Sequence, residues 1–297
     1  MAIIDDIKRN YLQGSMLLRL IFINIGVFLL LHVLAIGAML FNVGADILHW
    51  VELPSDLTLL AHRPWTLVTY MFAHFGLLHI LFNMLWLYWL GRIFMEFFSP
   101  KQLTGVYLLG GWGGALLYLL AYNLLPHFAG SQGLLLGASA SVIAIVVATA
   151  VYVPDYKIGL LFLGEVSLKW VAIVTVVIDL VGLEGGNIGG NLAHIGGAIV
   201  GVWFALSIKK GRDITRPLNA AIDAVVGLFN GRSANVFKRP KRESAPKQQS
   251  ATPNRPSDLV SEDELDAILG KIKAAGYDAL TDEEKDKLFK ASRRREP

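Results

Sequence analysis

Four polar residues of this largely apolar chain have the side chains needed for acyl transfer. Ser139 stands in "LLLGASASV", and a serine hydroxyl becomes a good nucleophile once a base removes its proton. His194, in "AHIGG", is suited to be that base near neutral pH. The attack creates an oxyanion, which His79, Asn83 and backbone N–H groups can stabilise. These residue types predict a serine hydrolase site.

Long apolar blocks must position these residues. Hydrophobic residues make up 54% of the 297 positions and charged residues only 17%, with a mean hydropathy of +0.50. A soluble domain usually has about 25% charged residues, and a helix needs about 20 apolar residues to cross a bilayer. We therefore predict an all-α membrane protein, a six-transmembrane-helix bundle with spans at 17–41, 77–98, 103–125, 134–153, 168–183 and 189–208.

The distribution of Lys and Arg predicts how the bundle is oriented. Cytoplasmic ends of spans carry an excess of these residues. If the N-terminus is inside, the outer loops receive only Arg63. The inner side then receives Lys8, Arg9, Arg19, Arg92, Lys101, Lys157, Lys169, Lys209, Lys210 and Arg212. We therefore predict an N-in, C-in topology.

The same topology brings the four candidate residues to one depth. The second, fourth and sixth spans run from outside to inside, and a helix rises about 1.5 Å per residue. His79 and Asn83 then lie about 3 and 9 Å inside the outer end, on one helix face. Ser139 and His194 each lie about 7 Å inside theirs. Such convergence on three helices predicts a site near the outer face of the membrane.

Small residues and one acid surround the predicted site. Gly137 allows a close approach to the serine, and Gly197 with Gly201 forms a G-x-x-x-G face on which the sixth span can pack against the fourth. No third residue that orients His194 is evident. Asp179 in the fifth span is a weak triad candidate, because it counts from the inner side to past mid-membrane, and we expect a structural role for it.

The remaining segments differ in character from the spans. The outer segment 42–76 is apolar and aromatic, so we expect it to lie partly in the interface or to fold back on the helices. The predicted parts are a cytoplasmic N-terminus 1–16, a membrane domain 17–208, a juxtamembrane amphipathic helix 209–230, a disordered linker 231–257 and a small helical hairpin 258–297.

Two capping boxes predict the helices of the C-terminal hairpin. Ser261 with Glu264 begins the first, and Thr281 with Glu284 begins the second. Gly276 is a suitable stop between them. We expect this small cytoplasmic tail, with the amphipathic helix before it, to bind lipid or a cytosolic partner.

Other classes of membrane protein fit the sequence less well. A metalloprotease needs H-E-x-x-H, whereas His74 and His79 are five apart with no Glu between them. An aspartyl intramembrane protease needs two membrane aspartates, and only Asp179 qualifies. A transporter would place polar groups along a path rather than on one side. We expect no metal, no cofactor and no nucleic acid. The open alternative is an inactive binder of transmembrane helices.

Three motifs on three different spans resemble one known family. "HILFN" at 79–83, "GASA" at 137–140 and "AHIGGAIVG" at 193–201, with Trp65 and His74 before them, are similar to the rhomboid intramembrane serine proteases. The resemblance covers roughly residues 17–208 in the right order. It departs from the usual pattern at Thr66, Ala140 and Ile143, where many members have arginine, glycine and an aromatic residue.

The resemblance implies a function for the candidate residues. Ser139 resembles the nucleophile and His194 the general base of a Ser-His dyad that works without a third acid. His79 and Asn83 resemble the oxyanion-stabilising residues, and Glu96 a structural acid. The family cleaves transmembrane or juxtamembrane segments of membrane proteins, and its fifth span with the following cap, here 183–190, is thought to gate entry. The chain is then expected in the cell membrane, the inner membrane if bacterial, with its active site facing outward.

Overall fold

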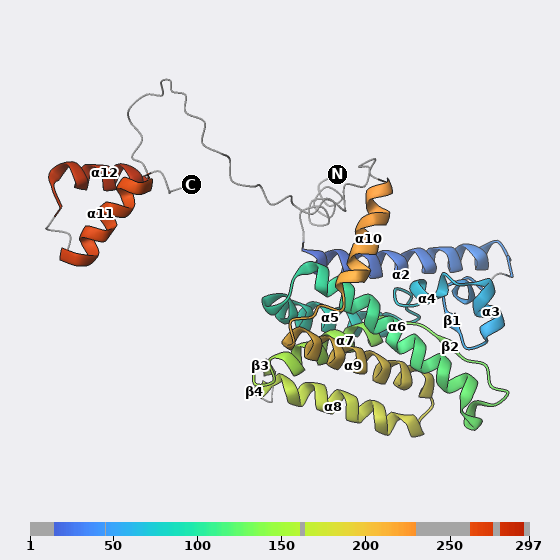
Figure 1. Ribbon diagram of the computed structural model, residues 1–297. Helices are drawn as coiled ribbons and strands as arrows, with labels where there is room; N and C mark the ends of the chain where they lie inside the picture. The colour runs from blue at the N-terminus through green and yellow to red at the C-terminus, as the bar shows by residue number, and fades with distance from the viewer. Residues whose placement is uncertain (1–14, 45, 161–163, 230–261, 276–279, 294–297) are drawn as a thin grey trace. The chain divides into compact units, whose positions relative to one another are not determined.

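The computed structural model describes residues 15–44, 46–160, 164–229, 262–275 and 280–293. The chain divides into two units, residues 1–237 and 238–297, and each is described by itself. Figure 1 shows that the first unit is a bundle of helices, which run roughly alongside one another, with only short strands at its ends.

Four helices of the first unit are long and apolar enough to cross a membrane. They are α2 (Met16–Leu40), α5 (Leu77–Phe97), α6 (Pro100–Leu124) and α9 (Ile188–Lys209). Two further apolar helices, α7 (Ser139–Tyr152) and α8 (Leu168–Val181), have 14 residues each. The all-α, multi-pass character is therefore confirmed, whereas the count of six spans and their topology stay predictions, since 14 residues rise only about 21 Å.

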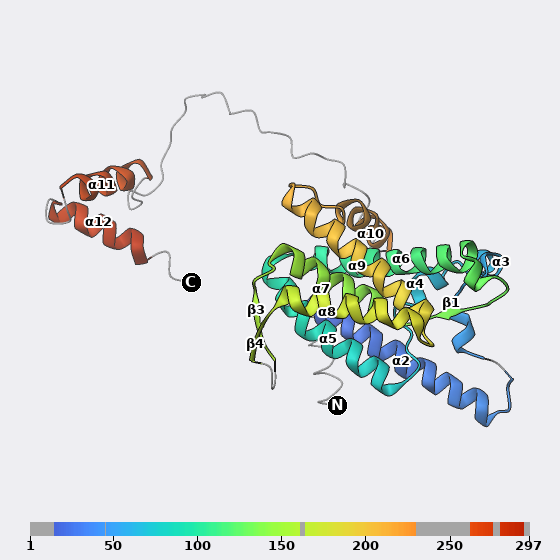
Figure 2. The same cartoon turned by 90° about the horizontal axis from the view of Figure 1, so that it is seen from below.

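Helix α7 lies at the centre of the bundle, among α5, α6, α8 and α9 (Figure 2). Every side chain from Ala140 to Ala150 is buried, and the helix packs against α5, α6, α8 and α9. Small residues permit this packing: a Cβ built on Gly110 of α6 would lie 2.4 Å from Cβ of Ala144, and one on Gly114 would lie 2.7 Å from that of Ala140. In lipid, such close contact of backbones is a main source of helix association.

The first residues of the predicted fourth span are not helical. Leu134–Leu135 form strand β2, which pairs antiparallel with β1 (Leu53–Pro54), and the helix begins only at Ser139. Gly137, just before the helix, has φ of +120°, which lies outside the helical region and favours glycine. The prediction of a span over 134–153 was therefore wrong at its N-terminal end, because Leu134 and Leu135 pair as a strand with a distant segment.

The outer segment 42–76 folds back on the helices. It contains η1 (Leu48–Trp50), α3 (Leu57–His62) and α4 (Thr66–Thr69). Trp112 of α6 donates its indole N–H to the carbonyl of Leu67 at 3.1 Å, and the hydroxyl of Tyr70 donates to the carbonyl of Gly111. The outer segment is thus a fixed part of the bundle.

Short 3₁₀ turns η2 (Pro126–Phe128) and η3 (Gly182–Glu184) follow α6 and α8.

Two elements lie between or after the later helices. The strands β3 (Lys157–Leu160) and β4 (Gly164–Ser167) form an antiparallel hairpin that the sequence analysis did not predict. After α9, helix α10 (Arg216–Phe229) crosses the first turns of α6 (Figure 1). There Lys101 pairs with Asp223 at 2.5 Å and receives a hydrogen bond on its carbonyl from Asn219 at 3.0 Å. Polar side chains of α10 therefore face the bundle.

The second unit contains helices α11 (Glu262–Ala275) and α12 (Asp282–Arg293). The predicted capping box of α12 is present, since Thr281 and Glu284 exchange side chain to backbone hydrogen bonds. Lys287 pairs with Glu264 across the two helices at 3.1 Å. The predictions for Ser261, Gly276, the linker 231–257 and most of the N-terminus 1–16 fall outside the described residues.

Candidate active site

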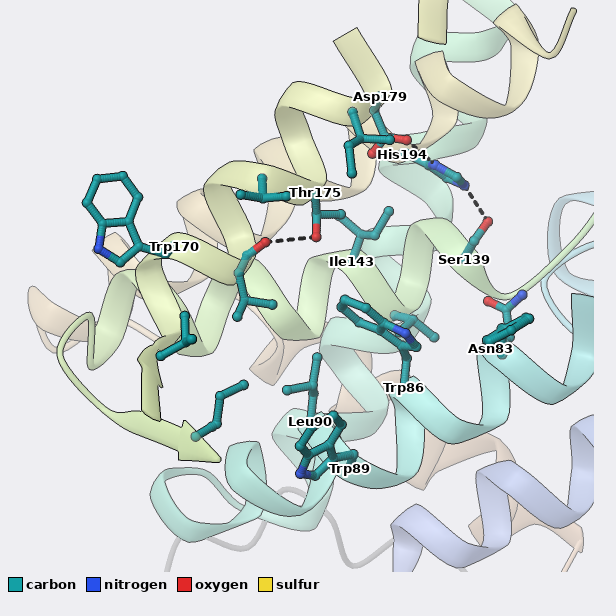
Figure 3. Close-up of a pocket in the computed structure, with 17 residues that line it drawn as sticks. Asn83, Trp86, Trp89, Leu90, Ser139, Ile143, Trp170, Thr175, Asp179 and His194 are labelled. Atoms are coloured by element: carbon teal, nitrogen blue, oxygen red, sulfur yellow. Dashed lines mark hydrogen bonds and ion pairs between the residues drawn. The ribbon is translucent and has the colours of Figure 1, made fainter. Parts of the chain in front are cut away.

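Ser139 and His194 form a hydrogen-bonded pair. Ser139 is the first residue of α7, and His194 lies in the second turn of α9. The hydroxyl oxygen of Ser139 is 2.7 Å from Nε2 of His194, as Figure 3 shows. The two helices hold this geometry because α9 packs directly on α7. A hydroxyl hydrogen-bonded to an imidazole nitrogen is the arrangement of an activated nucleophile.

The other ring nitrogen of His194 contacts Asp179. Nδ1 is 2.7 Å from Oδ1 of this buried carboxylate, which α8 supplies. The expectation that no third residue lies at His194 is therefore not met. Asp179 is only two residues from the C-terminal end of α8 at Val181. The weak triad candidate therefore lies beside the second turn of α9, where His194 stands.

A tight turn delivers the serine to the start of α7. The N–H of Gly137 donates to the carbonyl of Tyr70 at 2.9 Å, and the N–H of Ala138 donates to Nε2 of His74 at 3.4 Å. A Cβ at Gly137 would lie 2.9 Å from the ring of His79. The small residue at 137 thus lets the imidazole approach, in addition to permitting the positive φ.

His74 is a neutral, buried support for this turn. Its Nδ1–H donates to the carbonyl of Phe72 at 3.3 Å, which leaves Nε2 free to accept from Ala138. Burial, helped by the neighbouring His79, lowers the pKa of His74 from 6.5 to about 4. The ring therefore stays uncharged at neutral pH and can accept the hydrogen bond from the N–H of Ala138.

The two residues predicted to stabilise an oxyanion, His79 and Asn83, lie on α5. His79 and Asn83 lie on one face of α5, one turn apart, and the ring of His79 lies against the serine turn. Asn83 donates one amide hydrogen to the carbonyl of His79 at 2.9 Å, which leaves the second hydrogen for a ligand. The first N–H groups of α7 also lack partners within the helix. Asn83 thus lines the same pocket as Ser139, and the ring of His79 lies against Gly137, two residues before the serine.

Two glycines of α9 lie directly against α7. A Cβ on Gly197 would be 2.2 Å from the carbonyl oxygen of Ala140, and one on Gly201 would be 2.5 Å from that of Ala144. These are backbone atoms, which cannot move aside without shifting the helix. The expected G-x-x-x-G face is therefore the surface by which α9 approaches α7, and it sets the separation of His194 from Ser139.

An apolar groove of about 520 Å³ leads to the paired residues. Aliphatic and indole side chains of α5 and α8 form its two walls, and Ser139, Asn83, Asp179 and His194 lie together at one end of it (Figure 3). The apolar lining residues are Phe82, Trp86, Trp89, Leu90, Val142, Ile143, Ile158, Val166, Trp170, Val171, Val174 and Ile178. In the part of the chain that the structure describes, no group of His, Asp and Glu could hold a metal ion.

A bundle of membrane helices that carries a Ser-His pair and an apolar groove defines a polytopic membrane protein with the groups of a serine hydrolase. Residues 61–210 match the family model described as the Rhomboid domain, which covers half of the chain. The chain therefore belongs to the rhomboid family, as its three motifs predicted.

Relatives come from organelles and from bacteria. The chain is 30% identical over 220 residues to "RHOMBOID-like protein 12, mitochondrial" of Arabidopsis thaliana, which covers 69% of this chain and 62% of the relative. It is 28% identical over 136 residues to "Presenilin-associated rhomboid-like protein A, mitochondrial" of Danio rerio, covering 45% and 34%. It is 29% identical over 211 residues to "Rhomboid protease GlpG" of Photorhabdus laumondii, covering 68% and 65%. The chain thus spans less than two thirds of each relative's length.

Proposed function

We propose that this protein is an intramembrane serine endopeptidase, which cleaves transmembrane or juxtamembrane segments of membrane proteins. The observation that carries the proposal is the 2.7 Å contact of Ser139 Oγ with His194 Nε2 at the end of an apolar groove. Membership of the rhomboid family and the similarity to proteins named as proteases support it.

The proposed reaction is acyl transfer in two stages. Nε2 of His194 takes the Ser139 proton while Oγ bonds to the scissile carbonyl carbon, and His79, Asn83 and backbone N–H groups stabilise the oxyanion. The protonated ring then gives its proton to the leaving amine as the C–N bond breaks. Water attacks the resulting ester with the ring as base, which releases the carboxylic acid and restores the serine.

The lining of the groove supports an apolar substrate segment. Indoles and aliphatic side chains of α5 and α8 form its walls, and its polar groups lie at one end. A membrane helix fits such a surface, because its own side chains are apolar around its whole circumference. We place the polar end toward the outer side of the cell membrane, on the Lys and Arg distribution of the chain.

The test is cleavage by purified protein. Incubation in detergent with a model transmembrane substrate is expected to give two fragments, and a fluorophosphonate probe is expected to label the serine. Ser139→Ala should abolish both activities, and His194→Ala should reduce each by about 100-fold or more. Ser141→Ala, which removes a buried hydroxyl on the same helix, is the matched control. Cleavage by Ser139→Ala would refute the proposal.

The alternative is an inactive protein that binds transmembrane helices. It predicts that the parent neither cleaves nor is labelled, and that an intact helix co-purifies with it. The groove alone would support such binding, whereas the Ser139–His194 contact would then have no use.

Helix α10 is proposed to lie on the inner surface of the membrane. Asn219 and Asp223 face α6, while Val225, Val226 and Leu228 are 53%, 49% and 78% exposed. A helix that directs polar groups to the protein and aliphatic groups outward is stable where those aliphatic groups meet lipid. This proposal concerns helix α10 of the first unit only. For the second unit, we propose that the hairpin α11–α12 binds a cytosolic partner.

A further inference from the structure

The contact between Asp179 and His194 determines which nitrogen of the ring carries the proton. A carboxylate can only accept hydrogen bonds, so Nδ1, at 2.7 Å from Oδ1, must be the protonated nitrogen. In a neutral ring Nε2 is then unprotonated, and it is the nitrogen that lies 2.7 Å from the Ser139 hydroxyl. The acid thus selects the tautomer that can accept the serine proton.

The surroundings of Asp179 do not account for it as a packing residue. Its side chain is 8% exposed, and Oδ2 has no hydrogen-bond partner among the described residues. A buried carboxylate with an unpaired oxygen destabilises a fold, and an ionisable group within membrane helices is costly as well. Each buried polar atom without a partner in a native structure calls for an explanation, and a role in catalysis is one such explanation.

We propose that Asp179 is a positioning residue that orients His194 and stabilises the protonated ring, so that the chain works as a Ser-His-Asp triad spread over α7, α9 and α8. This inference rests on the proposed protease function. It also links the base to the groove, because α8 carries Asp179 and forms one groove wall. The base is oriented only when the end of α8 is in place against α9.

The experiment compares isosteric variants of two buried polar residues. Asp179→Asn keeps the shape but removes the charge. Thr149→Val is the matched control, since Thr149 of α7 is buried outside the groove and its hydroxyl donates to the carbonyl of Ile145 in its own helix. The purified proteins are compared for cleavage of a model transmembrane substrate, the rate of fluorophosphonate labelling and thermal unfolding in the same detergent.

The expected result is a fall in kcat and in labelling rate of about 10- to 1,000-fold for Asp179→Asn, because both depend on the serine–base pair. Its KM and unfolding temperature should stay close to those of the parent. Thr149→Val should retain activity within about twofold in the same assays.

Two results would overturn the proposal. One is kcat and labelling by Asp179→Asn within about twofold of the parent. The other is a loss that appears only as a raised KM or a lowered unfolding temperature, which would assign Asp179 a structural role. An inactive parent, or an active Ser139→Ala, would instead be the failure of the protease function, and this inference would fall with it.

Discussion

Replacement of Gly197 by alanine tests whether the packing of α9 on α7 sets the catalytic geometry. The added Cβ would lie 2.2 Å from the carbonyl oxygen of Ala140 and 2.9 Å from its carbonyl carbon. Both are backbone atoms of the central helix, so no side chain can rotate to make room. The two helices must separate instead.

The size of the separation follows from these distances. An ordinary contact between a carbon and an oxygen is about 3.2 Å or longer, so α9 must move by roughly 1 Å. A shift of this size would lengthen the 2.7 Å contact between Ser139 and His194 beyond hydrogen-bond range. Misplacement by about 1 Å can cost about 100-fold in rate, and overpacking costs about 1–3 kcal/mol of stability.

The assay is fluorophosphonate labelling together with thermal unfolding. Gly197→Ala should label about 100-fold more slowly than the parent and unfold at a lower temperature. Gly37→Ala on α2 is the matched control, because nothing lies within 4 Å of its Cβ position and alanine favours a helix. Parent-like labelling by Gly197→Ala would refute the reasoning that this contact fixes the pair.

Three further predictions concern the turn, the groove and helix α10. Burial lowers the pKa of His74 from 6.5 to about 4, because the folded protein favours the neutral ring. The folded state should therefore keep its full stability above pH 6.5 and lose part of it as the pH falls toward 4. In thermal unfolding measured against pH, His74→Gln should lose less unfolding free energy on acidification than the parent, by up to about 3 kcal/mol. Parallel stability curves for the two proteins would contradict this prediction. Val174→Asp should lower kcat/KM for an apolar substrate about 10- to 100-fold but leave fluorophosphonate labelling near the parent rate, since it charges only the groove wall; equal losses in both would argue against a substrate groove. The chain has no cysteine, so single cysteines can be introduced as probes. In vesicles, Val226→Cys on α10 should react slowly with a water-soluble maleimide, whereas Arg212→Cys at an exposed position should react readily. Equal modification of the two variants would exclude a lipid contact of α10.

The sequence by itself determined the membrane helices and most of the site. Long apolar blocks predicted the helices because a bilayer requires about 20 apolar residues, and the observed bounds of α2, α5 and α9 differ from the predicted ones by only one residue. Direction and rise then convert residue number into depth, which is why Ser139, His194, His79 and Asn83 could be placed together from their positions alone.

The tertiary structure decided what depends on contacts between distant segments. The pairing of Leu134–Leu135 with Leu53–Pro54 displaced the start of α7 to Ser139, because a strand partner 80 residues away leaves no local signal. The packing of α8 against α7 and α9 brought Asp179 to His194, and no pattern along the sequence specifies that contact. The groove is formed by α5 and α8, each of which packs on α7, and this arrangement is a property of packing rather than of composition.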